Sequence, residues 1–422
     1  MADGGFSILD FWFLNYYDCR RNGDATLIDA HEIIILAHMR LKIRTMSDIY
    51  HFKGFIRDVT YKAHLDAPLT LYDFDAFDIN SAKPYGLIKF PKGQIGYSKW
   101  VSPKRTRTYP FERLYNIYNS PMRLTVIPIL KDEGLDGDLD RIQYSTISWM
   151  NLLNVYIVLG YYANARKNMS PLQRHREKLT AQKLDTASVH GQIGEISQYK
   201  QSALHWNRSL IEDRFVEIYQ KALERYSEIG RRTNVRVHDR AGQLLYLDKL
   251  MQDFEEFKNI SLRGSRGAAL RETRTAHSFE YLADGSKATF EIQNYLGGIY
   301  YLTADEIIQE DNRFVIQESK NATRGFLPSI ADIKDGLFKL ILFSNLDTLT
   351  LNGKRVQFGT RLKLTGTNVR GSLRLPCAER QIHNFVDANA SQLTNRHKDI
   401  IGKLNLEASS NRNLEIAIEG NN

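Results

Sequence analysis

The sequence predicts a mixed α/β protein in which helices and strands both contribute to the core. Three observations support this fold class: the chain has 422 residues and is 42% hydrophobic, period-2 alternation marks several short strands, and helical periodicity marks the middle of the chain. This length is too great for one ordinary core, so we expect two or three domains.

Changes of pattern divide the chain into four parts. Residues 1–185 predict an N-terminal α/β region whose first part is largely helical, and residues 186–262 predict a helical segment. Residues 263–376 predict a mixed sheet flanked by helices. Residues 377–422 form a polar, Asn-rich extension whose last residues we expect to fray.

The stretch from residue 300 to 320 is the most informative part of the chain. It reads YYLTADEIIQEDNRFVIQESK, which predicts two strands joined by a short polar turn. Side chains alternate along a strand, so Glu318 and Lys320 share one face, and the hairpin can set Asp305 beside them. Two carboxylates and an ammonium at one sheet edge can hold Mg²⁺, which prefers hard oxygen ligands and acidifies a bound water.

A helix and two further strands are predicted after Lys320. Ser329, with an acid three residues later, is close to a capping box and begins an apolar helical segment. Asn352-Gly353 between two alternating runs predicts a hairpin, and residues 361–366 predict another strand.

This arrangement resembles the PD-(D/E)XK nuclease superfamily, and in particular type II restriction endonucleases. The resemblance covers roughly residues 272–365, with Asp305 matching the Asp of the signature and Glu318-Ser319-Lys320 matching its (D/E)-x-K; Ala304 replaces the Pro. It implies that Asp305 and Glu318 ligate Mg²⁺ and that Lys320 orients the attacking water or helps to deprotonate it. It also implies a PD-(D/E)XK-like mixed sheet and products with 5′-phosphate and 3′-hydroxyl ends.

Two other interpretations compete with a metal site at Asp305 and Glu318. An exposed strand often carries Glu and Lys two apart as a solvated face, although the apolar run Phe314-Val315-Ile316 favours a buried strand. Residues 132–140 form a rival acidic cluster with loop-like spacing, and a plain polar loop is the simpler interpretation of it.

Basic residues suggest where nucleic acid would bind. The formal charge is +8, and residues 83–111 contain seven Lys or Arg and no acid, interleaved with aromatic residues in a loop-like segment. The predicted DNA contacts here are Lys99, Trp100, Lys104, Arg105 and Arg107. Arg263 and Arg266 begin a Gly- and Arg-rich stretch that suits either a phosphate-gripping loop or a soluble linker.

Several classes of protein are disfavoured by the sequence. There is no Walker A motif and no G-x-G-x-x-G after a strand, so we expect no nucleotide cofactor. Cys19 and Cys377 are the only cysteines, which fits a reducing cytoplasm. Residues 147–163 are apolar but short and interrupted by polar side chains, so we interpret them as a buried core element and expect no membrane span.

The sequence therefore predicts a cytoplasmic Mg²⁺-dependent endodeoxyribonuclease that cuts double-stranded DNA at a specific site, as a homodimer matching a palindrome. Two alternatives stay open: another PD-(D/E)XK nuclease acting in repair, mobile elements or defence against phage, and a non-enzymatic DNA-binding protein. The recognition sequence does not follow from the residues, because base readout depends on groove geometry.

Overall fold

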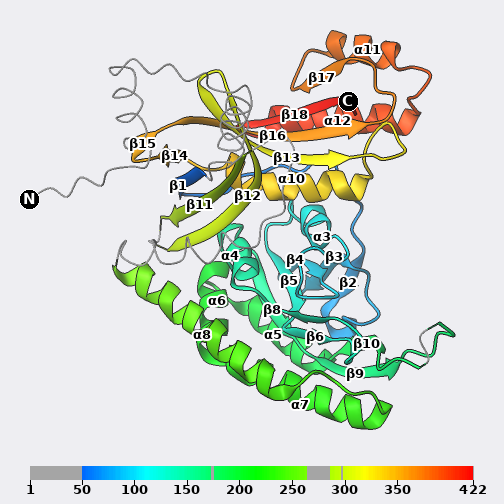
Figure 1. The fold of residues 1–422 in the computed structure, drawn as a ribbon, viewed down its shortest axis with the longest axis vertical. Coiled ribbons are helices and arrows are strands. Elements are labelled where there is room, and N and C mark those ends of the chain that lie inside the picture. The colour runs from blue at the N-terminus through cyan, green and yellow to red at the C-terminus, as the bar shows by residue number, and fades with distance from the viewer. Residues whose placement is uncertain (1–49, 173–174, 264–285, 296–297, 422) are drawn as a thin grey trace, which may run out of the picture. The chain divides into compact units, whose positions relative to one another are not determined.

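The computed structural model describes residues 50–172, 175–263, 286–295 and 298–421 (Figure 1). Within these ranges, the side chains of residues 256–263, 286–287 and 305 lie outside the description. All described residues belong to one compact unit, Ile49–Asn422.

The larger of the two main sheets has nine strands among the described residues, in the order β15-β14-β1-β11-β12-β13-β16-β18-β17. Its strands are β1 (Tyr50–Ile56), β11 (Ser286–Asn294), β12 (Ile299–Glu310), β13 (Arg313–Asn321), β14 (Thr348–Leu351), β15 (Lys354–Arg355), β16 (Gln357–Gly366), β17 (Ser372–Leu375) and β18 (Leu414–Gly420). Because β13, β16 and β18 are parallel neighbours, their carboxyl ends meet at one edge of the sheet.

Strand β12 connects the two halves of this sheet. It pairs with β11 from Ile299 to Ala304, and its pairing with β13 begins at Glu306. The register with β11 shifts between Ala304 and Ile307, which marks a bulge. Bulges bend a strand and are common beside active sites, so position 305 lies where the sheet changes direction.

A second sheet has five strands within the described ranges, in the order β2-β3-β4-β5-β8. They are β2 (Leu71–Asp73), β3 (Tyr85–Phe90), β4 (Gly93–Lys99), β5 (Arg123–Pro128) and β8 (Tyr156–Gly160). Two ribbons accompany this sheet: β6 (Leu130–Asp132) with β7 (Leu139–Arg141), and β9 (Tyr162–Lys167) with β10 (Leu179–Leu184). Strand β5 lies between two parallel neighbours, and its apolar side chains are buried, as expected for a covered strand.

Helices cover the sheets and join them. The helices of the described part are η1 (Phe74–Ala76), α3 (Pro110–Asn116), α4 (Tyr144–Leu152), α5 (Thr186–Gln198), α6 (Ala203–Ser209), η2 (Leu210–Arg214), α7 (Phe215–Thr233), α8 (Arg240–Arg263), α10 (Ile330–Ser344), α11 (Glu379–Ala388) and α12 (Asn395–Ser410). The five-residue π-helix η2 joins α6 to α7 directly, so these three elements form one continuous helical rod.

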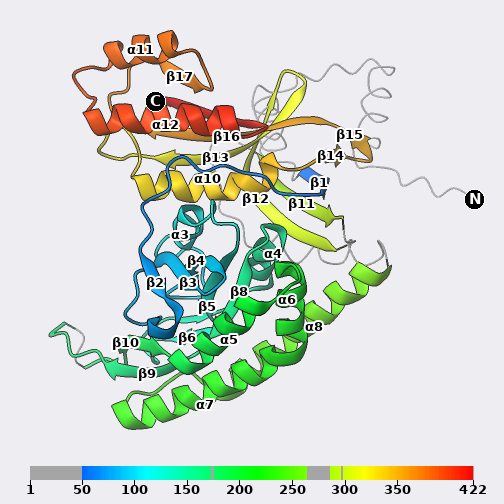
Figure 2. The ribbon, with the colours of Figure 1, turned by 180° about the vertical axis from the view of Figure 1, so that it is seen from behind.

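Helix α10 lies between the two main sheets (Figures 1 and 2). Phe338 on one side packs on Phe111 of α3 with ring centroids 4.9 Å apart, and Phe343 packs on Phe290 of β11 at the same distance. Since both sides of α10 carry large apolar residues that bury fully, the helix joins the two sheets into one core.

The predicted mixed α/β class is confirmed, and so are several local predictions. Ser329 caps α10 by accepting a hydrogen bond from the Asp332 backbone N–H at 3.2 Å. Asn352 and Gly353 have φ of 51° and 76°, the left-handed pair that a tight type I′ hairpin requires. Most of residues 147–163 are buried, in α4, β8 and the start of β9, as expected for a core element.

The structure differs from the expected division at both ends of the described chain. Strand β1, from the predicted N-terminal region, lies between β14 and β11 of the large sheet. The expected fraying of the last residues is wrong for Glu419 and Gly420, which end β18, a strand between β16 and β17. The polar composition of the tail obscured a period-2 pattern in which Leu414, Ile416 and Ile418 are buried.

Candidate functional site

The charged side chains of β13 meet helix α10 near the carboxyl end of that strand. The Lys320 Nζ lies 3.1 Å from the Glu318 Oε1 and 2.9 Å from the Asp335 Oδ2. The Lys339 Nζ lies 2.7 Å from the same Glu318 Oε1. We call Glu318, Lys320, Asp335 and Lys339 the β13–α10 cluster. The predicted shared face of Glu318 and Lys320 is confirmed, since both reach side chains of one helix.

The electrostatics of this cluster fix the charge of Lys320. Burial alone would lower the pKa of Lys320, but the neighbouring Glu318 and Asp335 carboxylates outweigh burial and raise that pKa. Lys320 is therefore an ammonium at neutral pH. A general base needs a pKa near the working pH, so in this arrangement Lys320 is suited to orienting groups by its charge rather than to accepting a proton.

Gly336 allows α10 to approach the strands at this point. A Cβ atom on Gly336 would lie 2.6 Å from the Leu362 Cδ1, 3.3 Å from the Lys320 Cε and 3.4 Å from the Glu318 Cγ. Leu362 is fully buried on β16, so it has little room to move away. The missing side chain at position 336 is therefore what lets Asp335 and Lys339 reach the strand.

The opposite face of β13 carries a separate polar group. Gln317 Nε2 and the Ser319 hydroxyl each donate to the Glu306 Oε2, at 2.9 Å in both cases. Glu306 is buried, with 9% of its surface exposed. The side chains adjacent in sequence to Glu318 and Lys320 thus serve a hydrogen-bond network that supports the hairpin and does not belong to the β13–α10 cluster.

The predicted residue Asp305 lies in the bulge of β12. Its neighbour Glu306 pairs with Gln317, so the register continued by one position brings residue 305 opposite Glu318. The pairing of β12 with β13 thus agrees with the expected proximity of positions 305 and 318. The side chain of Asp305 lies outside the described part of the structure, so its role as a ligand stays a prediction.

Tyr109, in the segment between β4 and α3, lies close to the β13–α10 cluster. Thr108 and Tyr109 have φ of 59° and 49°, a left-handed conformation that costs energy for residues other than glycine. The Asp332 carboxylate, which is hydrogen-bonded to the phenol, is the main cause of a raised pKa of Tyr109, and Asp335 adds to it. Tyr109 is 48% exposed, so the strained backbone presents an aromatic ring to solvent beside α10.

Two of the predicted DNA contacts are structural in this conformation. Lys99 at the end of β4 donates from its Nζ to the backbone carbonyls of Ile79, at 2.6 Å, and Ala82, at 2.5 Å. Trp100 is 2% exposed and packs edge-on against Phe111. The segment expected to be a loop begins with the β3–β4 hairpin, and this hairpin uses its aromatic residues for the core rather than for stacking on bases.

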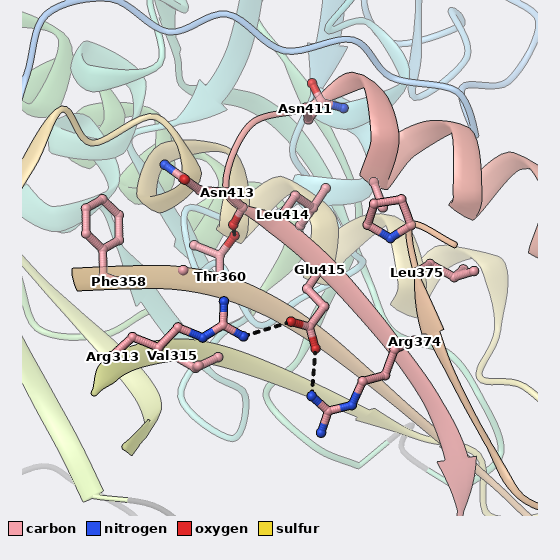
Figure 3. A pocket seen from close by; sticks show the side chains of 13 residues that line it. Arg313, Val315, Phe358, Thr360, Arg374, Leu375, Asn411, Asn413, Leu414 and Glu415 are labelled. Atoms are coloured by element: carbon pink, nitrogen blue, oxygen red, sulfur yellow. Dashed lines mark hydrogen bonds and ion pairs between the residues drawn. The ribbon is translucent and has the colours of Figure 1, made fainter. Parts of the chain in front are cut away.

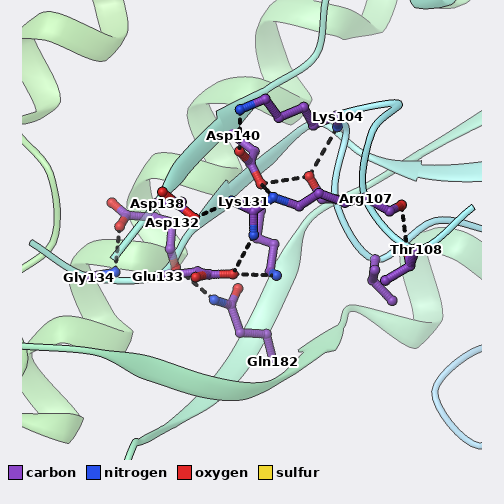
Figure 4. Close-up of polar contacts among 12 residues, drawn as sticks. Lys104, Arg107, Thr108, Lys131, Asp132, Glu133, Gly134, Asp138, Asp140 and Gln182 are labelled. Atoms are coloured by element: carbon purple, nitrogen blue, oxygen red, sulfur yellow. Dashed lines mark hydrogen bonds and ion pairs between the residues drawn. The ribbon is translucent and has the colours of Figure 1, made fainter. Parts of the chain in front are cut away.

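Arg107 joins the basic segment to the acidic cluster of residues 132–140 (Figure 4). Its guanidinium contacts Glu133 at 3.2 Å, Asp140 at 3.0 Å and also Asp138. The Asp132 carboxylate accepts from the His238 and Gly134 backbone N–H groups instead. Much of the rival metal site is therefore occupied by a cation of the chain itself, and the cluster anchors the segment that leads to Tyr109.

The remaining predicted DNA contacts are more exposed or lie outside the description. Lys104 has 54% of its side chain exposed and only a 3.9 Å contact with Asp140. Arg105 is half-buried and donates to the Ser145 hydroxyl at 3.3 Å. The side chain of Arg263 and the whole of Arg266 lie outside the described residues. Lys104 and Arg105 are thus the described members of the set that can reach a partner.

Two residues of the site were missed from the sequence. Asp335 and Lys339 are four apart on α10, a spacing that places both on one helix face. The sequence shows this spacing, but the spacing does not predict that this helix face packs against β13. Tyr109 was one of the aromatic residues noted in the basic segment, but its place beside α10 depends on the packing of α3 against α10.

Comparison of the chain with protein-family models, with curated proteins and with solved structures gave no match. Every helix in the described ranges is too short or too polar to cross a membrane.

Proposed function

We propose that this protein is a Mg²⁺-dependent endodeoxyribonuclease, of the type II restriction kind, that hydrolyses double-stranded DNA. The observation that supports it most is the position of Lys320 between Glu318 and Asp335, at the carboxyl end of a strand whose neighbour β12 bulges beside it. The resemblance of the Asp305 and Glu318-Ser319-Lys320 pattern to the PD-(D/E)XK signature adds to this, as does the net charge of +8.

The charges around the cluster suit a divalent cation. The described charged groups are the carboxylates of Glu318, Asp335 and Asp332 and the ammoniums of Lys320 and Lys339, which leaves one net negative charge. The carboxylate of Asp305, proposed below as a further ligand, would raise this to two negative charges, which one divalent cation balances.

The donor atoms also suit Mg²⁺. The ion pairs of Glu318 use its Oε1 and that of Asp335 uses its Oδ2, so Glu318 Oε2 and Asp335 Oδ1 are the oxygens proposed as ligands, with Asp305 as a further one. A bound divalent cation supplies Lewis-acid polarisation of the phosphoryl group and an acidified water.

The chain's own residues then hold the reacting groups. Lys320, kept charged by its two carboxylates, would attract a non-bridging oxygen of the scissile phosphate and orient the water. Lys339 would neutralise Glu318 when no substrate is bound. Tyr109 offers an exposed ring at the edge of the site, where a nucleotide can stack.

The proposal also covers the substrate, the oligomeric state and the cellular compartment. Double-stranded DNA is the proposed substrate and a homodimer the proposed assembly, since two scissile phosphates require two sites. The cytoplasm is the proposed compartment.

Cleavage of a bacteriophage genome with and without Mg²⁺ tests this function, because such DNA presents many sequences at once. Glu318→Ala and Lys320→Ala should each lose about 100-fold or more in rate, as expected for groups that hold the reacting atoms. Lys221→Ala, which removes an exposed lysine paired with Glu217 on α7, is the matched control and should cut like the wild type. Intact DNA with the wild-type protein and Mg²⁺ or Mn²⁺ would argue against a nuclease.

A further inference from the structure

A cavity of about 460 Å³ lies near the amino ends of β13, β16 and β18, whereas the β13–α10 cluster lies near the carboxyl end of β13 (Figure 3). Its wall combines apolar and polar side chains, among them Phe358, Pro376 and Asn413. Its charged lining residues are Arg313, Arg374 and Glu415. A cavity with an apolar wall and a few converging polar groups is typical of a ligand site.

The buried Arg361 beside this cavity is balanced by Glu310. Its guanidinium donates to both oxygens of Glu310, with the Nη2 at 2.6 Å from the Oε2. The hydrogen bond from Arg361 lowers the pKa of Glu310, so Glu310 is ionised at neutral pH. With 5% of its side chain exposed, Arg361 belongs to the sheet and not to the cavity mouth.

Glu415 is shared among three arginines. Its Oε1 lies 2.8 Å from the Arg361 Nε and 3.4 Å from the Arg374 Nη1, and its Oε2 lies 3.1 Å from the Arg313 Nη2. Glu310 also lies near these two arginines, with its Oε2 3.8 Å from the Arg313 Nη2 and 4.0 Å from the Arg374 Nη1. One positive charge is therefore left in this network of three arginines and two glutamates.

The excess charge is accessible. The side chains of Arg313 and Arg374 are 44% and 62% exposed, and each contacts one oxygen of the Glu415 carboxylate (Figure 3). Glu415 thus shows that the two guanidiniums can grip a single oxyanion. Guanidinium groups bind phosphate through paired hydrogen bonds, which makes Arg the usual residue for such sites.

We propose that this cavity binds a phosphate group between Arg313 and Arg374, with an organic part of the ligand against Val315, which shares the strand face of Arg313, and against Pro376. The two sources of such a group are a small organic phosphate, such as a nucleoside monophosphate, and a phosphate of DNA. This site does not depend on the nuclease proposal, because none of its residues belongs to the β13–α10 cluster.

Isothermal titration of the full chain with inorganic phosphate, deoxyadenosine monophosphate and a short duplex identifies the source. The wild type should bind at least one of them, and Arg374→Gln and Arg313→Gln should each weaken that binding at least fivefold. The matched control is Arg208→Gln on α6. It removes an exposed arginine that pairs with Glu212 of η2, and it should leave the affinity for phosphate unchanged. The monophosphate binding more tightly than the duplex assigns a small-molecule site, and the reverse assigns a DNA contact.

The variant Glu415→Gln distinguishes two interpretations of these arginines: a phosphate-binding site, and an ion-pair network that only stabilises the sheet. It removes the carboxylate that competes for both guanidiniums, so phosphate affinity should rise at least threefold. Circular dichroism checks that each variant is folded, and the two Arg variants serve if Glu415→Gln does not fold. The proposal is overturned if the wild type binds none of the three ligands at millimolar concentration, or if folded Arg313 and Arg374 variants bind like the control.

Discussion

At the level of single residues, two ionisable groups, one half-buried and one fully buried, show how neighbours decide charge. Lys320 is surrounded by carboxylates, which raise its pKa and keep it charged. Glu407 on α12 is fully buried and accepts hydrogen bonds from the Tyr61 hydroxyl at 2.6 Å, the Tyr115 hydroxyl at 2.8 Å and the His64 backbone N–H at 2.6 Å. With no cation among those donors, burial dominates and raises the pKa of Glu407 to about 7.

Lys320→Arg tests whether the geometry of the charge matters and not only its sign. Arginine keeps the charge but replaces a compact ammonium with a wide planar fork, which does not fit between Glu318 and Asp335 at contacts of 3.1 and 2.9 Å. We expect single-turnover DNA cleavage to fall by about 100-fold, nearly as far as in Lys320→Ala, because small misplacements of reacting groups are costly. Near-wild-type rates in both folded variants would remove Lys320 from the mechanism.

Glu407 predicts a pH dependence of stability. Its pKa of about 7 in the folded protein lies above the ordinary value of about 4.3 for an unfolded chain. Between these pH values the folded state keeps a proton that the unfolded state releases, so the free energy of unfolding falls as pH rises through this window. The loss amounts to about 4 kcal/mol at most.

Glu407→Gln should remove this part of the pH dependence. Urea unfolding at pH 5 and pH 8 should show a larger loss of stability for the wild type than for the variant. Glu217→Gln, at a solvent-exposed carboxylate on α7, is the control and should follow the wild type. Parallel pH profiles for Glu407→Gln and the wild type would mean that Glu407 is already ionised in the folded state near pH 5.

At the level of elements, much of the site was predictable where local pattern decides structure. The β12–β13 hairpin, the shared face of Glu318 and Lys320 and the capped start of α10 all follow from alternation, turn chemistry and capping. The meeting of Asp335 and Lys339 with β13 depends on how α10 packs on the sheet. A one-dimensional pattern does not contain that packing, and the same holds for Tyr109 on the neighbouring loop.

Gly336 makes the packing of α10 testable. Alanine in a helix interior is favoured over glycine by about 1 kcal/mol. At position 336 the new methyl group would lie 2.6 Å from the buried Leu362 Cδ1, so the helix must shift. Such overpacking costs about 1–3 kcal/mol. We therefore expect Gly336→Ala to lower the free energy of unfolding and to slow DNA cleavage, because it moves Asp335 and Lys339 away from β13.

Gly402→Ala on α12 is the matched control. A Cβ at that position meets no atom within 4 Å, so only the helix preference of alanine remains. This variant should be stabilised by up to about 1 kcal/mol and should cut DNA normally. Chemical denaturation measures the free energy of unfolding of both variants. A decrease for Gly336→Ala together with an increase for Gly402→Ala supports tight packing at Gly336. Stabilisation at both positions would show that α10 has room to spare.

At the level of the whole molecule, the large sheet combines strands far apart in sequence. Strand β1 pairs with β11 and β14, and β18 lies between β16 and β17. Local pattern finds such strands but not their neighbours, so the expected domain boundaries did not anticipate this sheet. The basic segment shows the same limit: its composition suggested one DNA-binding surface, whereas folding assigns Lys99 to backbone carbonyls and Arg107 to acidic partners.

DNA binding by the folded molecule should therefore depend on the basic residues that folding leaves accessible. Lys104 has more than half of its side chain exposed, and Arg105 is half-buried and donates to the Ser145 hydroxyl. Each phosphate contact releases counterions and adds about 0.9 to the slope of log affinity against log salt. The double variant Lys104→Ala/Arg105→Ala should lower that slope by between about 1 and 2. Fluorescence anisotropy with a labelled duplex from 50 to 300 mM NaCl, about the range over which such slopes are resolved, measures it.

Two further variants separate surface contact from folding. Lys221→Ala/Arg225→Ala removes the same charge from α7, where both residues are exposed and paired with acids, and should leave the slope unchanged if DNA binds at the basic segment. Arg107→Ala should lower stability instead of the slope, because Asp140, with 2% of its side chain exposed, loses its closest cation. If the two double variants lower the slope equally, the attraction is one of overall charge, and the segment after β4 is not the DNA-binding surface.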